Sequence, residues 1–508
     1  MIVLVAICSF LIVSQLSSAQ DCLSRDFGND GTVCVCNADH CDTLAPIAKV
    51  QKGTYASFTS NLDGLRFKKD EGSLEASTEN ATNLINIGKK TYQEILGFGG
   101  AFTDATGINI KSLSEDVQDK LIQAYFSENG LEYNIGRVPI GGTDFSLEGY
   151  SYCDTENDTA DPQLTQFNLT SADHDYKIPF IIKALELTNN KLDLFGSAWI
   201  APNWMKTIPG FLARDSFIKD EFYQAWADYF VKFLQAYKEQ NIPFWGITTG
   251  NEPLTAYGQK KIPSVAWNVE LAKKWIKENL GPALRKSEFS DIKLMMLDDQ
   301  RLLLPSAANE LLDDKEVDKY VDGIAVHWYS DWIISTKNLD DTNDNHPEKF
   351  LLATEACNGY MFNDVLIGNW DRGEAYAKSI IEDLNHWVTG WTDWNMALNV
   401  DGGPTFINNV VDSPIIVNAA ANEFYKQPMY YALGHFSKFI PKGSLRLESS
   451  SFDDQVNVGA YRRPDGGTVV VVLNKDTEAK NATIRDASNS KDIEIALSPK
   501  SITSLVFW

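Results

Sequence analysis

The sequence predicts an α/β fold, a (β/α)8 TIM barrel that carries an attached β-sandwich. Between about residues 96 and 398, short apolar strands alternate with amphipathic helical stretches, as in a parallel sheet covered by helices. Eight such strands can be counted, which is the number that closes a TIM barrel. Beyond about residue 438 the pattern changes to alternating strands separated by turns, which is typical of a sandwich.

The chain begins with an apolar run, residues 1–13, followed by the small residues Ser17, Ser18 and Ala19. This pattern predicts a cleaved signal peptide over residues 1–19. The alternative is a membrane anchor, but a run of about 13 residues is too short to span a bilayer. No later segment is long and apolar enough for a transmembrane helix.

The next segment is rich in cysteine and supports export of the chain. Cys22, Cys34, Cys36 and Cys41 crowd into about 20 residues, and we expect them to form disulfides. Zinc binding is the alternative, but the C-x-C-x4-C spacing lacks the CxxC pairs of such sites. Four N-glycosylation acceptors agree with a secretory route: Asn80, Asn157, Asn168 and Asn481.

Residues 50–93 are rich in turns and short strands, so they can supply strands to the C-terminal sandwich. The sandwich itself is predicted from alternating strands at 456–461, 468–473 and 502–507. The barrel strands are predicted at Ile95–Gly99, Tyr133–Pro139, Leu192–Ala198, Phe244–Thr249, Lys293–Leu297, Gly323–Val326, Phe350–Thr354 and Gly390–Trp394.

Polar or aromatic residues follow all eight barrel strands, at the end where a TIM barrel keeps its active site. Asp298 and Asp299 beside Arg301 are the exception in our interpretation, because they favour an ion-pair network over catalysis. The strand-end residues are Thr103, Asp104, Thr143, Asp144, Trp199, Asn251, Glu252, Asp298, Asp299, His327, Trp328, Tyr329, Glu355, Trp394 and Asn395.

Two of these strand-end residues, Glu252 and Glu355, suit the hydrolysis of a glycosidic bond. That reaction needs one protonated and one ionised carboxyl group on either side of the bond. Strands four and seven lie on roughly opposite sides of the barrel, so the two glutamates can face each other across a sugar. We expect Glu252 to be the acid/base and Glu355 the nucleophile of a retaining enzyme, with the carboxyl groups about 5 to 5.5 Å apart.

The sequence also predicts which side chains contact the sugar, and it argues against other classes of catalytic site. Trp199, Trp328, Tyr329 and Trp394 offer aromatic faces to a pyranose ring, and Asp144 can accept hydrogen bonds from its hydroxyls. The six histidines are scattered without an HExxH motif, and neither a GxSxG elbow nor a P-loop occurs. We therefore expect no metal and no cofactor.

The net charge of the chain limits the classes of partner that it can bind. Its 69 acidic and 45 basic residues give a formal net charge of −24, which argues against a nucleic-acid partner. The same charge would repel an anionic membrane surface at neutral pH. Protonation of carboxylates in an acidic compartment would weaken that repulsion.

Several long motifs make the chain similar to the lysosomal glucosylceramide-cleaving β-glucosidases of glycoside hydrolase family 30, over nearly the whole mature length. The motifs are CVCNA at 34–38, GFGGA at 97–101, RVP at 137–139, DFS at 144–146, LDDQRLLLP at 297–305, AVHWY at 325–329, EAC at 355–357, GWTDWN at 390–395 and GHFSKFIP at 434–441.

The resemblance implies the same roles for Glu252 and Glu355 that the strand-end argument gives. It also implies disulfides Cys22–Cys34 and Cys36–Cys41, with Cys153 and Cys357 as free thiols. Glucose contacts are carried over onto Asp144, Trp199, Asn251, Tyr329, Trp394 and Asn409.

The resemblance implies an architecture as well. It predicts a small disulfide-linked N-terminal sheet from residues 20–47 plus 396–427 and a sandwich from 48–93 plus 440–508. The barrel would take residues 94–395 plus 428–439. A lysosomal location reached through the secretory pathway is implied, with secretion as the alternative.

Three functions follow from these patterns. The leading hypothesis is a retaining exo-β-glucosidase that cleaves glucosylceramide, with peripheral contact to a lipid surface and a saposin-type activator as partners. The second is a retaining glycosidase for soluble glucosides or glycans, because residues 254–267 depart from the family pattern and the chain is acidic. The third is a catalytically silent sugar- or partner-binding protein.

Overall fold

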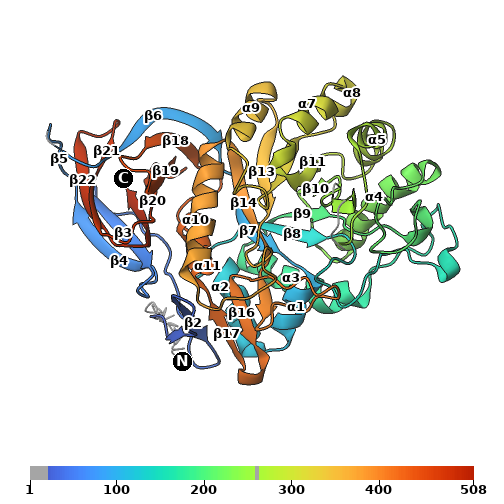
Figure 1. Cartoon of the computed structure of the whole chain (residues 1–508), viewed down its shortest axis with the longest axis horizontal. Helices are drawn as coiled ribbons and strands as arrows, with labels where there is room; N and C mark the ends of the chain where they lie inside the picture. Colours follow the sequence, from blue (N-terminus) through green and yellow to red (C-terminus); the bar gives the residue numbers. More distant parts are fainter. Residues whose placement is uncertain (1–20, 80, 254, 258–261) are drawn as a thin grey trace, which may run out of the picture.

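The computed structural model describes residues 21–508 except 80, 254 and 258–261, and three sheets organise this part of the chain (Figure 1). The expected signal peptide, residues 1–19, lies outside the described residues. In Figure 1 the sandwich lies to the left of the barrel, and the small sheet lies below both.

The barrel is closed by eight parallel strands, as the sequence predicts. Their order around the barrel is β10-β11-β12-β13-β14-β7-β8-β9, so β10 and β13 lie three strands apart and face each other across the mouth. The strands are β7 Gly97–Ala101, β8 Ile135–Pro139, β9 Asp193–Ser197, β10 Gly246–Thr248, β11 Lys293–Gln300, β12 Gly323–His327, β13 Phe350–Glu355 and β14 Val388–Asn395.

The helices follow the strands and cover the outside of the barrel (Figure 1). Their inner faces are apolar, and α4 for example buries Tyr229, Phe233 and Leu234 against the strands. The helices are α1 Asp104–Lys111, α2 Glu115–Phe126, α3 Ile178–Leu187, α4 Tyr223–Glu239, α5 Val269–Trp275, α6 Gly281–Lys286, α7 Ser306–Leu312, α8 Lys315–Asp318, α9 Lys337–Asn345, α10 Trp370–Asn385 and α11 Pro428–Ser437.

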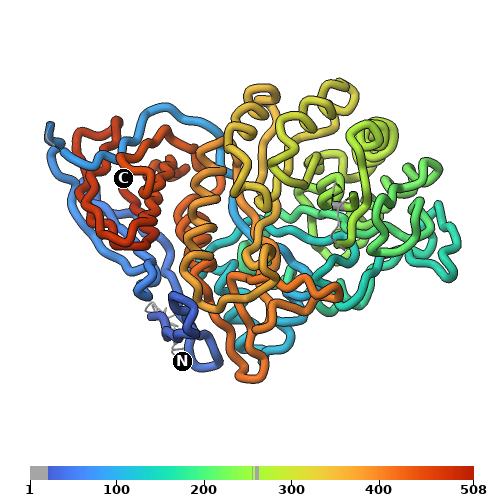
Figure 2. The backbone as a smooth tube through the Cα atoms, viewed as in Figure 1, coloured from blue at the N-terminus to red at the C-terminus, as the bar shows by residue number. Residues whose placement is uncertain are grey.

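The sandwich is a curled array of ten strands that joins distant parts of the chain. The prediction that residues 50–93 supply strands is confirmed, since β3 pairs antiparallel with the C-terminal β23. Figure 2 shows these blue and red segments side by side. The strands are β3 Thr54–Asn61, β4 Lys68–Ser73, β5 Glu75–Ala76, β6 Leu84–Glu94, β18 Leu445–Ser450, β19 Val456–Arg462, β20 Thr468–Asn474, β21 Lys480–Asp486, β22 Lys491–Leu497 and β23 Ser501–Phe507.

The small sheet joins the N-terminus to residues that follow the barrel. It has the order β1-β2-β17-β16-β15. The strands are β1 Ser24–Asp26, β2 Thr32–Cys36, β15 Ala397–Asn399, β16 Ile415–Asn418 and β17 Glu423–Lys426.

All four N-terminal cysteines form disulfides, which removes the zinc alternative. The pairs are Cys22–Cys34 and Cys36–Cys41, while Cys153 and Cys357 are free and buried. The predicted glycosylation acceptors Asn157, Asn168 and Asn481 are exposed, whereas Asn80 lies outside the described residues. No helix within the described ranges has the length and apolar character needed to cross a membrane.

Candidate active site

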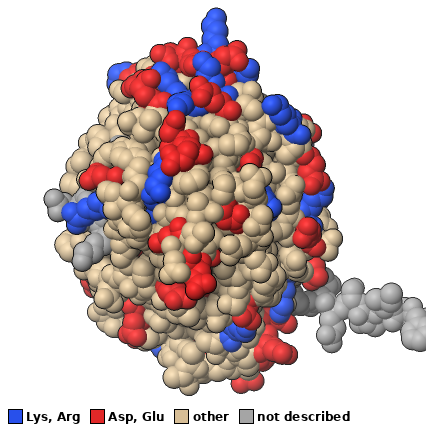
Figure 3. Space-filling view, turned by 90° about the vertical axis from the view of Figure 1, so that its right-hand side faces the viewer, with Lys and Arg blue, Asp and Glu red and all other residues tan. Residues whose placement is uncertain are grey.

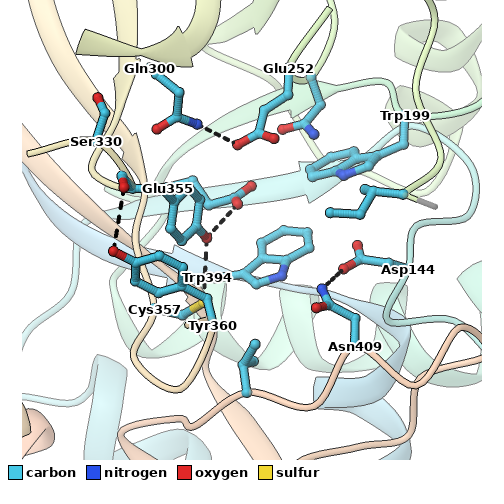
Figure 4. Close-up of a pocket in the computed structure, with 14 residues that line it drawn as sticks. Asp144, Trp199, Glu252, Gln300, Ser330, Glu355, Cys357, Tyr360, Trp394 and Asn409 are labelled. Carbon is cyan, nitrogen blue, oxygen red and sulfur yellow. Dashed lines mark hydrogen bonds between the residues drawn. The ribbon is translucent and has the colours of Figure 1, made fainter. Parts of the chain in front are cut away.

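A pocket of about 300 Å³ opens where the barrel strands end, and eight of the nine residues predicted to act on or bind a sugar line it (Figure 4). These eight residues come from the ends of six barrel strands, β8, β9, β10, β12, β13 and β14, or the loops that follow them, and from the segment between β15 and β16 that carries Asn409. The lining residues are Asp144, Trp199, Asn251, Glu252, Ile262, Gln300, Tyr329, Ser330, Glu355, Cys357, Tyr360, Trp394, Asn409 and Val411.

Glu252 lies in a strained turn just beyond β10. Its φ is +39° and that of Gly250 is +127°, so the chain turns sharply and directs the glutamate into the mouth. The backbone N–H of Glu252 donates to the carbonyl of Asp298 at 2.9 Å. Its side-chain Oε1 accepts hydrogen bonds from Gln300 Nε2 and His327 Nδ1, both at 2.8 Å.

Glu355 is the last residue of β13 and is buried. Its Oε1 accepts a hydrogen bond from the Tyr329 hydroxyl at 2.7 Å, and its Oε2 pairs with the Arg137 guanidinium. A carboxylate oxygen of Glu252 and one of Glu355 lie within 4.8 Å of each other. In Figure 4 the two side chains extend into the same space.

A buried ionic cluster lies beneath the two glutamates. Arg137 donates to Asp298 Oδ2 and to Asn251 Oδ1, both at 2.8 Å, and His327 Nε2 lies 3.0 Å from Asp298 Oδ1. Burial would raise the pKa of Asp298, but Arg137 and His327 outweigh it and hold that pKa far below its usual range.

The same cluster keeps His327 charged. Burial alone would lower the pKa of His327, but the carboxylates of Glu355, Asp298 and Glu252 raise it to about 10. Burial also raises the pKa of Glu355, and Glu252 adds to that effect, while His327 and Arg137 oppose it. A protonated histidine is a donor at both ring nitrogens, so it fixes the orientation of Glu252 and Asp298 together.

The wall opposite the glutamates is aromatic and polar. Trp199 and Trp394 stack on each other with ring centroids 4.9 Å apart, and Arg137 lies over Trp199 at 4.6 Å. Asn409 Nδ2 donates to Asp144 Oδ2 at 2.8 Å. Burial raises the pKa of Asp144 to about 7, so this carboxyl is largely protonated at acidic pH.

Two expectations about strand-end residues need correction. Trp328 does not line the pocket, because its indole N–H donates to the Cys357 carbonyl at 3.1 Å and its ring packs on Tyr376 and Trp391. Asp298 belongs to an ion-pair network as expected, but its partners are Arg137 and His327. Arg301 instead pairs with Asp331 and Asp383.

Sequence reasoning missed Arg137, Gln300, Cys357 and Tyr360 as residues of the site. Arg137 carried a usable signal, because a charged side chain within a buried barrel strand must point to a partner in the interior. The other three are placed by a β-bulge and by loops whose geometry has no local sequence mark.

Glu252, His327 and Glu355 are residue types that can bind a metal, and they lie close together. Their arrangement does not favour that role. Both ring nitrogens of His327 already donate to carboxylates, and a metal needs a free, unprotonated nitrogen.

A closed TIM barrel with two opposed carboxyl groups in a pocket at its mouth is the architecture of a glycoside hydrolase. The sequence model of the Glycosyl hydrolase family 30 TIM-barrel domain matches residues 95–440, and that of the family 30 beta sandwich domain matches 443–505. The chain therefore belongs to glycoside hydrolase family 30.

Individual relatives agree with this assignment. The chain is 45% identical to "Lysosomal acid glucosylceramidase" of Mus musculus over 94% of each chain. It is 26% identical to "Endo-1,6-beta-D-glucanase neg1" of Aspergillus fumigatus, over 80% of this chain and 81% of the relative. The crystal structure of SrfJ from Salmonella typhimurium superposes with a TM-score of 0.83 at 27% identity, covering 89% of this chain and 99% of that one.

Proposed function

We propose that this protein is a retaining exo-β-glucosidase that hydrolyses glucosylceramide to glucose and ceramide. The observation that carries the mechanism is the approach of Glu252 and Glu355 to within 4.8 Å. Retaining glycosidases hold their carboxyl groups about 5 to 5.5 Å apart, whereas inverting enzymes need about 6.5 to 9.5 Å to admit a water.

In the first step, the Glu355 carboxylate attacks the anomeric carbon, and Glu252 gives its proton to the glycosidic oxygen. The bond to the leaving group breaks, and a covalent glucosyl ester forms on Glu355. Arg137 and the Tyr329 hydroxyl orient the attacking carboxylate. Asn251 is positioned to hydrogen-bond the sugar 2-hydroxyl as charge develops.

In the second step, the ionised Glu252 takes a proton from a water molecule that attacks the anomeric carbon. The ester to Glu355 breaks, glucose leaves with retained configuration, and Glu252 regains its proton. Asp144, Asn409, Trp199 and Trp394 form the wall that holds the other hydroxyls and the apolar face of the sugar ring.

A lipid leaving group is supported by exposed apolar side chains around the mouth. Most of the exposed large hydrophobic residues in the described chain follow the barrel strands. Such a rim suits an amphiphilic substrate at a membrane surface, and a saposin-type lipid activator is the partner we propose. The rim residues are Leu147, Ile208, Leu212, Tyr257, Leu302, Trp332, Ile333, Met361, Phe362 and Val400.

The charge of the chain favours an acidic compartment. Clusters of Asp and Glu side chains lie among uncharged residues on the face shown in Figure 3. Their protonation at low pH would reduce repulsion from anionic lipids. Together with the name of the mouse relative, this supports a lysosomal location reached through the secretory pathway, with secretion as the alternative.

The nucleophile can be tested with a cyclophellitol epoxide, which esterifies the attacking carboxylate of a retaining β-glucosidase. We expect peptide mass spectrometry to find the label on Glu355 and activity to fall in parallel. Label on another residue would contradict the nucleophile assignment. Binding of glucosides without turnover from acidic to neutral pH would instead support the silent binding protein.

A second candidate is a glycosidase for soluble glucans, which the similarity to the Aspergillus fumigatus glucanase favours. The two candidates differ in substrate. Purified protein should hydrolyse glucosylceramide in anionic liposomes faster than β-linked gluco-oligosaccharides, and a saposin-type activator should raise the rate. Preference for oligosaccharides and indifference to the activator would favour the second candidate.

A further inference from the structure

A second cleft of about 380 Å³ adjoins the active-site pocket. Tyr360 lines both spaces, and the rings of Tyr329 and Tyr360 pack with centroids 4.8 Å apart between them. The cleft is bounded by the loops after β12 and β13 and by one side of α10. Its volume is within the range of small-molecule binding sites.

The α10 side of this cleft, its floor, carries three polar side chains among apolar surroundings. Ala375, Lys378, Ser379 and Glu382 lie on one face of α10, at the spacing that brings residues together on a helix. Ser379 is only 7% exposed, and among the described residues its hydroxyl has no hydrogen-bond partner. A buried hydroxyl without a partner is rare in folded proteins, so a ligand hydroxyl is a natural partner for it.

Further polar groups flank Ser379 and can also bind hydroxyls. Asp331 lines the cleft and pairs with Arg301 through a contact of 3.2 Å. Glu382 and Lys378 are 3.5 Å apart on the solvent side. These groups can accept and donate hydrogen bonds without losing their contacts with Arg301 and Lys378, because each carboxyl oxygen has more than one acceptor site.

The rim of the cleft is aromatic. Trp332 is 67% exposed and Phe362 is 82% exposed, and the two belong to the loops on either side. Exposed aromatic rings of this size are unusual on a free surface and mark binding sites. An aromatic rim above a floor of hydroxyl and charged groups matches a pyranose, which has apolar faces and a ring of hydroxyls.

We propose that this cleft is a second saccharide-binding site, distinct from the pocket that holds Glu252 and Glu355. An alkyl chain fits the floor poorly, because it would cover the Ser379 hydroxyl and the charged groups without bonding to them. A saccharide satisfies the floor through its hydroxyls and packs on the rim through its ring faces. The site does not depend on the reaction proposed above.

The test uses thiocellobiose, a disaccharide of β-linked glucose that glycosidases do not cleave. Its binding is measured by saturation-transfer NMR while 1-deoxynojirimycin saturates the active-site pocket. We expect residual binding that Ser379→Ala and Glu382→Gln each weaken at least about fivefold. Ser437→Ala is the matched control, because the Ser437 hydroxyl is also buried and without a hydrogen-bond partner among the described residues but lines neither space.

Hydrolysis of a small aryl β-glucoside should be unchanged in both cleft variants, which shows that they fold and that the first pocket is intact. Absence of residual binding, or residual binding that neither substitution weakens, would overturn the proposal. Binding of 1-octanol without binding of the disaccharide would also overturn it. Failure of 1-deoxynojirimycin to inhibit hydrolysis would count against the proposed glucosidase instead.

Discussion

Charge balance among five buried side chains explains how the two glutamates can take different roles. Two cations, Arg137 and His327, face the carboxyl groups of Asp298, Glu355 and Glu252. Asp298 is ionised throughout the physiological range, so one further carboxylate completes the balance. Glu355 pairs directly with Arg137, so Glu355 is the carboxyl group that we expect to be ionised. A proton on Glu252 then leaves the cluster neutral, as the first step of a retaining mechanism needs.

The role of Glu252 can be separated from that of Glu355 by the leaving group. Glu252→Gln removes the acid, so hydrolysis of an alkyl glucoside should slow by about 10²- to 10⁴-fold. A dinitrophenyl glucoside leaves without a proton, and its first step should slow far less. The measurement is single-turnover release of each leaving group. Glu355→Gln is the control and should abolish both reactions, while equal losses in Glu252→Gln would contradict the assignment.

Tyr329 should set the acidic limit of activity. Burial raises the pKa of Glu355, whereas the hydrogen bond from Tyr329 lowers it. Tyr329→Phe removes that bond, so the pKa of Glu355 should rise. Because the nucleophile must be ionised, the acid limb of the kcat/KM profile should move to higher pH by roughly one unit.

The matched control for this substitution is Tyr360→Phe. The Tyr360 hydroxyl lies 3.4 Å from the backbone carbonyl of Tyr329 and bonds no carboxylate in the described structure. Its removal should leave the acid limb in place. An unshifted limb in Tyr329→Phe, or equal shifts in both variants, would show that the Tyr329 hydrogen bond does not tune the nucleophile.

At the scale of elements, the sequence predicted all eight barrel strands but missed how β11 ends. Apolar alternation indicated a strand that stops at Leu297, whereas β11 continues to Gln300. A bulge makes the difference, since Leu297 and Asp298 have φ values of +76° and +51° and the register with β12 shifts there. The bulge points Asp298 at Arg137 and brings Gln300 to Glu252, contacts that no local pattern predicts.

Closure of the barrel depends on glycine at position 99. A Cβ there would lie 1.8 Å from the Ile135 carbonyl oxygen in the neighbouring β8. The Ile135 carbonyl belongs to the backbone of a paired strand and cannot move aside as a side chain can. Gly99→Ala should therefore lower the free energy of unfolding by more than about 3 kcal/mol. Denaturant unfolding followed by tryptophan fluorescence measures the loss.

Gly196→Ala in β9 is the control for this prediction. Its Cβ would meet only side-chain atoms, with Phe233 Cε1 at 3.0 Å and Ile140 Cδ1 at 3.1 Å. These side chains can shift, so the cost should be about 1 kcal/mol. Similar losses in the two variants would mean that β7 and β8 can move apart without opening the barrel.

At the scale of the whole molecule, residue patterns predicted the layers of the fold but did not predict the contacts between distant segments. Alternation at 456–461 and 502–507 predicted sandwich strands, and the turn-rich texture of residues 50–93 indicated their partners. The small sheet was reached only through family resemblance, because β2 and β17 lie almost 400 residues apart and pair through backbone groups. The cleft beside α10 was not predicted at all, since its walls come from two loops and a helix.

Buried acids with raised pKa values predict that the fold is more stable in mildly acidic than in alkaline solution. Burial raises the pKa of Asp144 and Asp383 to about 7 and that of Asp331 to about 8. The pKa of His327 is about 10. Each group holds its proton in the folded state at a pH where the unfolded chain has lost it. The three carboxyl groups therefore make stability fall as pH rises from about 4 to 8, and His327 adds to the fall above about pH 6.5.

His435 acts in the opposite direction over the acidic part of this window. Burial lowers its pKa to about 3, so it favours the folded state as pH rises toward the unfolded value of about 6.5. Above about pH 4 the three carboxyl groups outweigh this single histidine, so the stability that these groups control should be greatest near pH 4 to 5. One proton contributes about 1.4 kcal/mol per pH unit, so the unfolding midpoint should be roughly 5 °C lower at pH 8 than at pH 6.

Differential scanning calorimetry at fixed ionic strength measures this difference in midpoint. Asp144→Asn provides the matched variant, because asparagine keeps the shape of the side chain and cannot titrate. Its midpoint should depend less on pH between 6 and 8 than that of the wild type, with the remaining slope supplied by Asp331, Asp383 and His327. A wild-type midpoint that is constant or higher at pH 8 would show that these buried groups do not govern stability. The same protons that suit the fold to an acidic compartment also reduce the negative charge that would repel it from an anionic lipid surface.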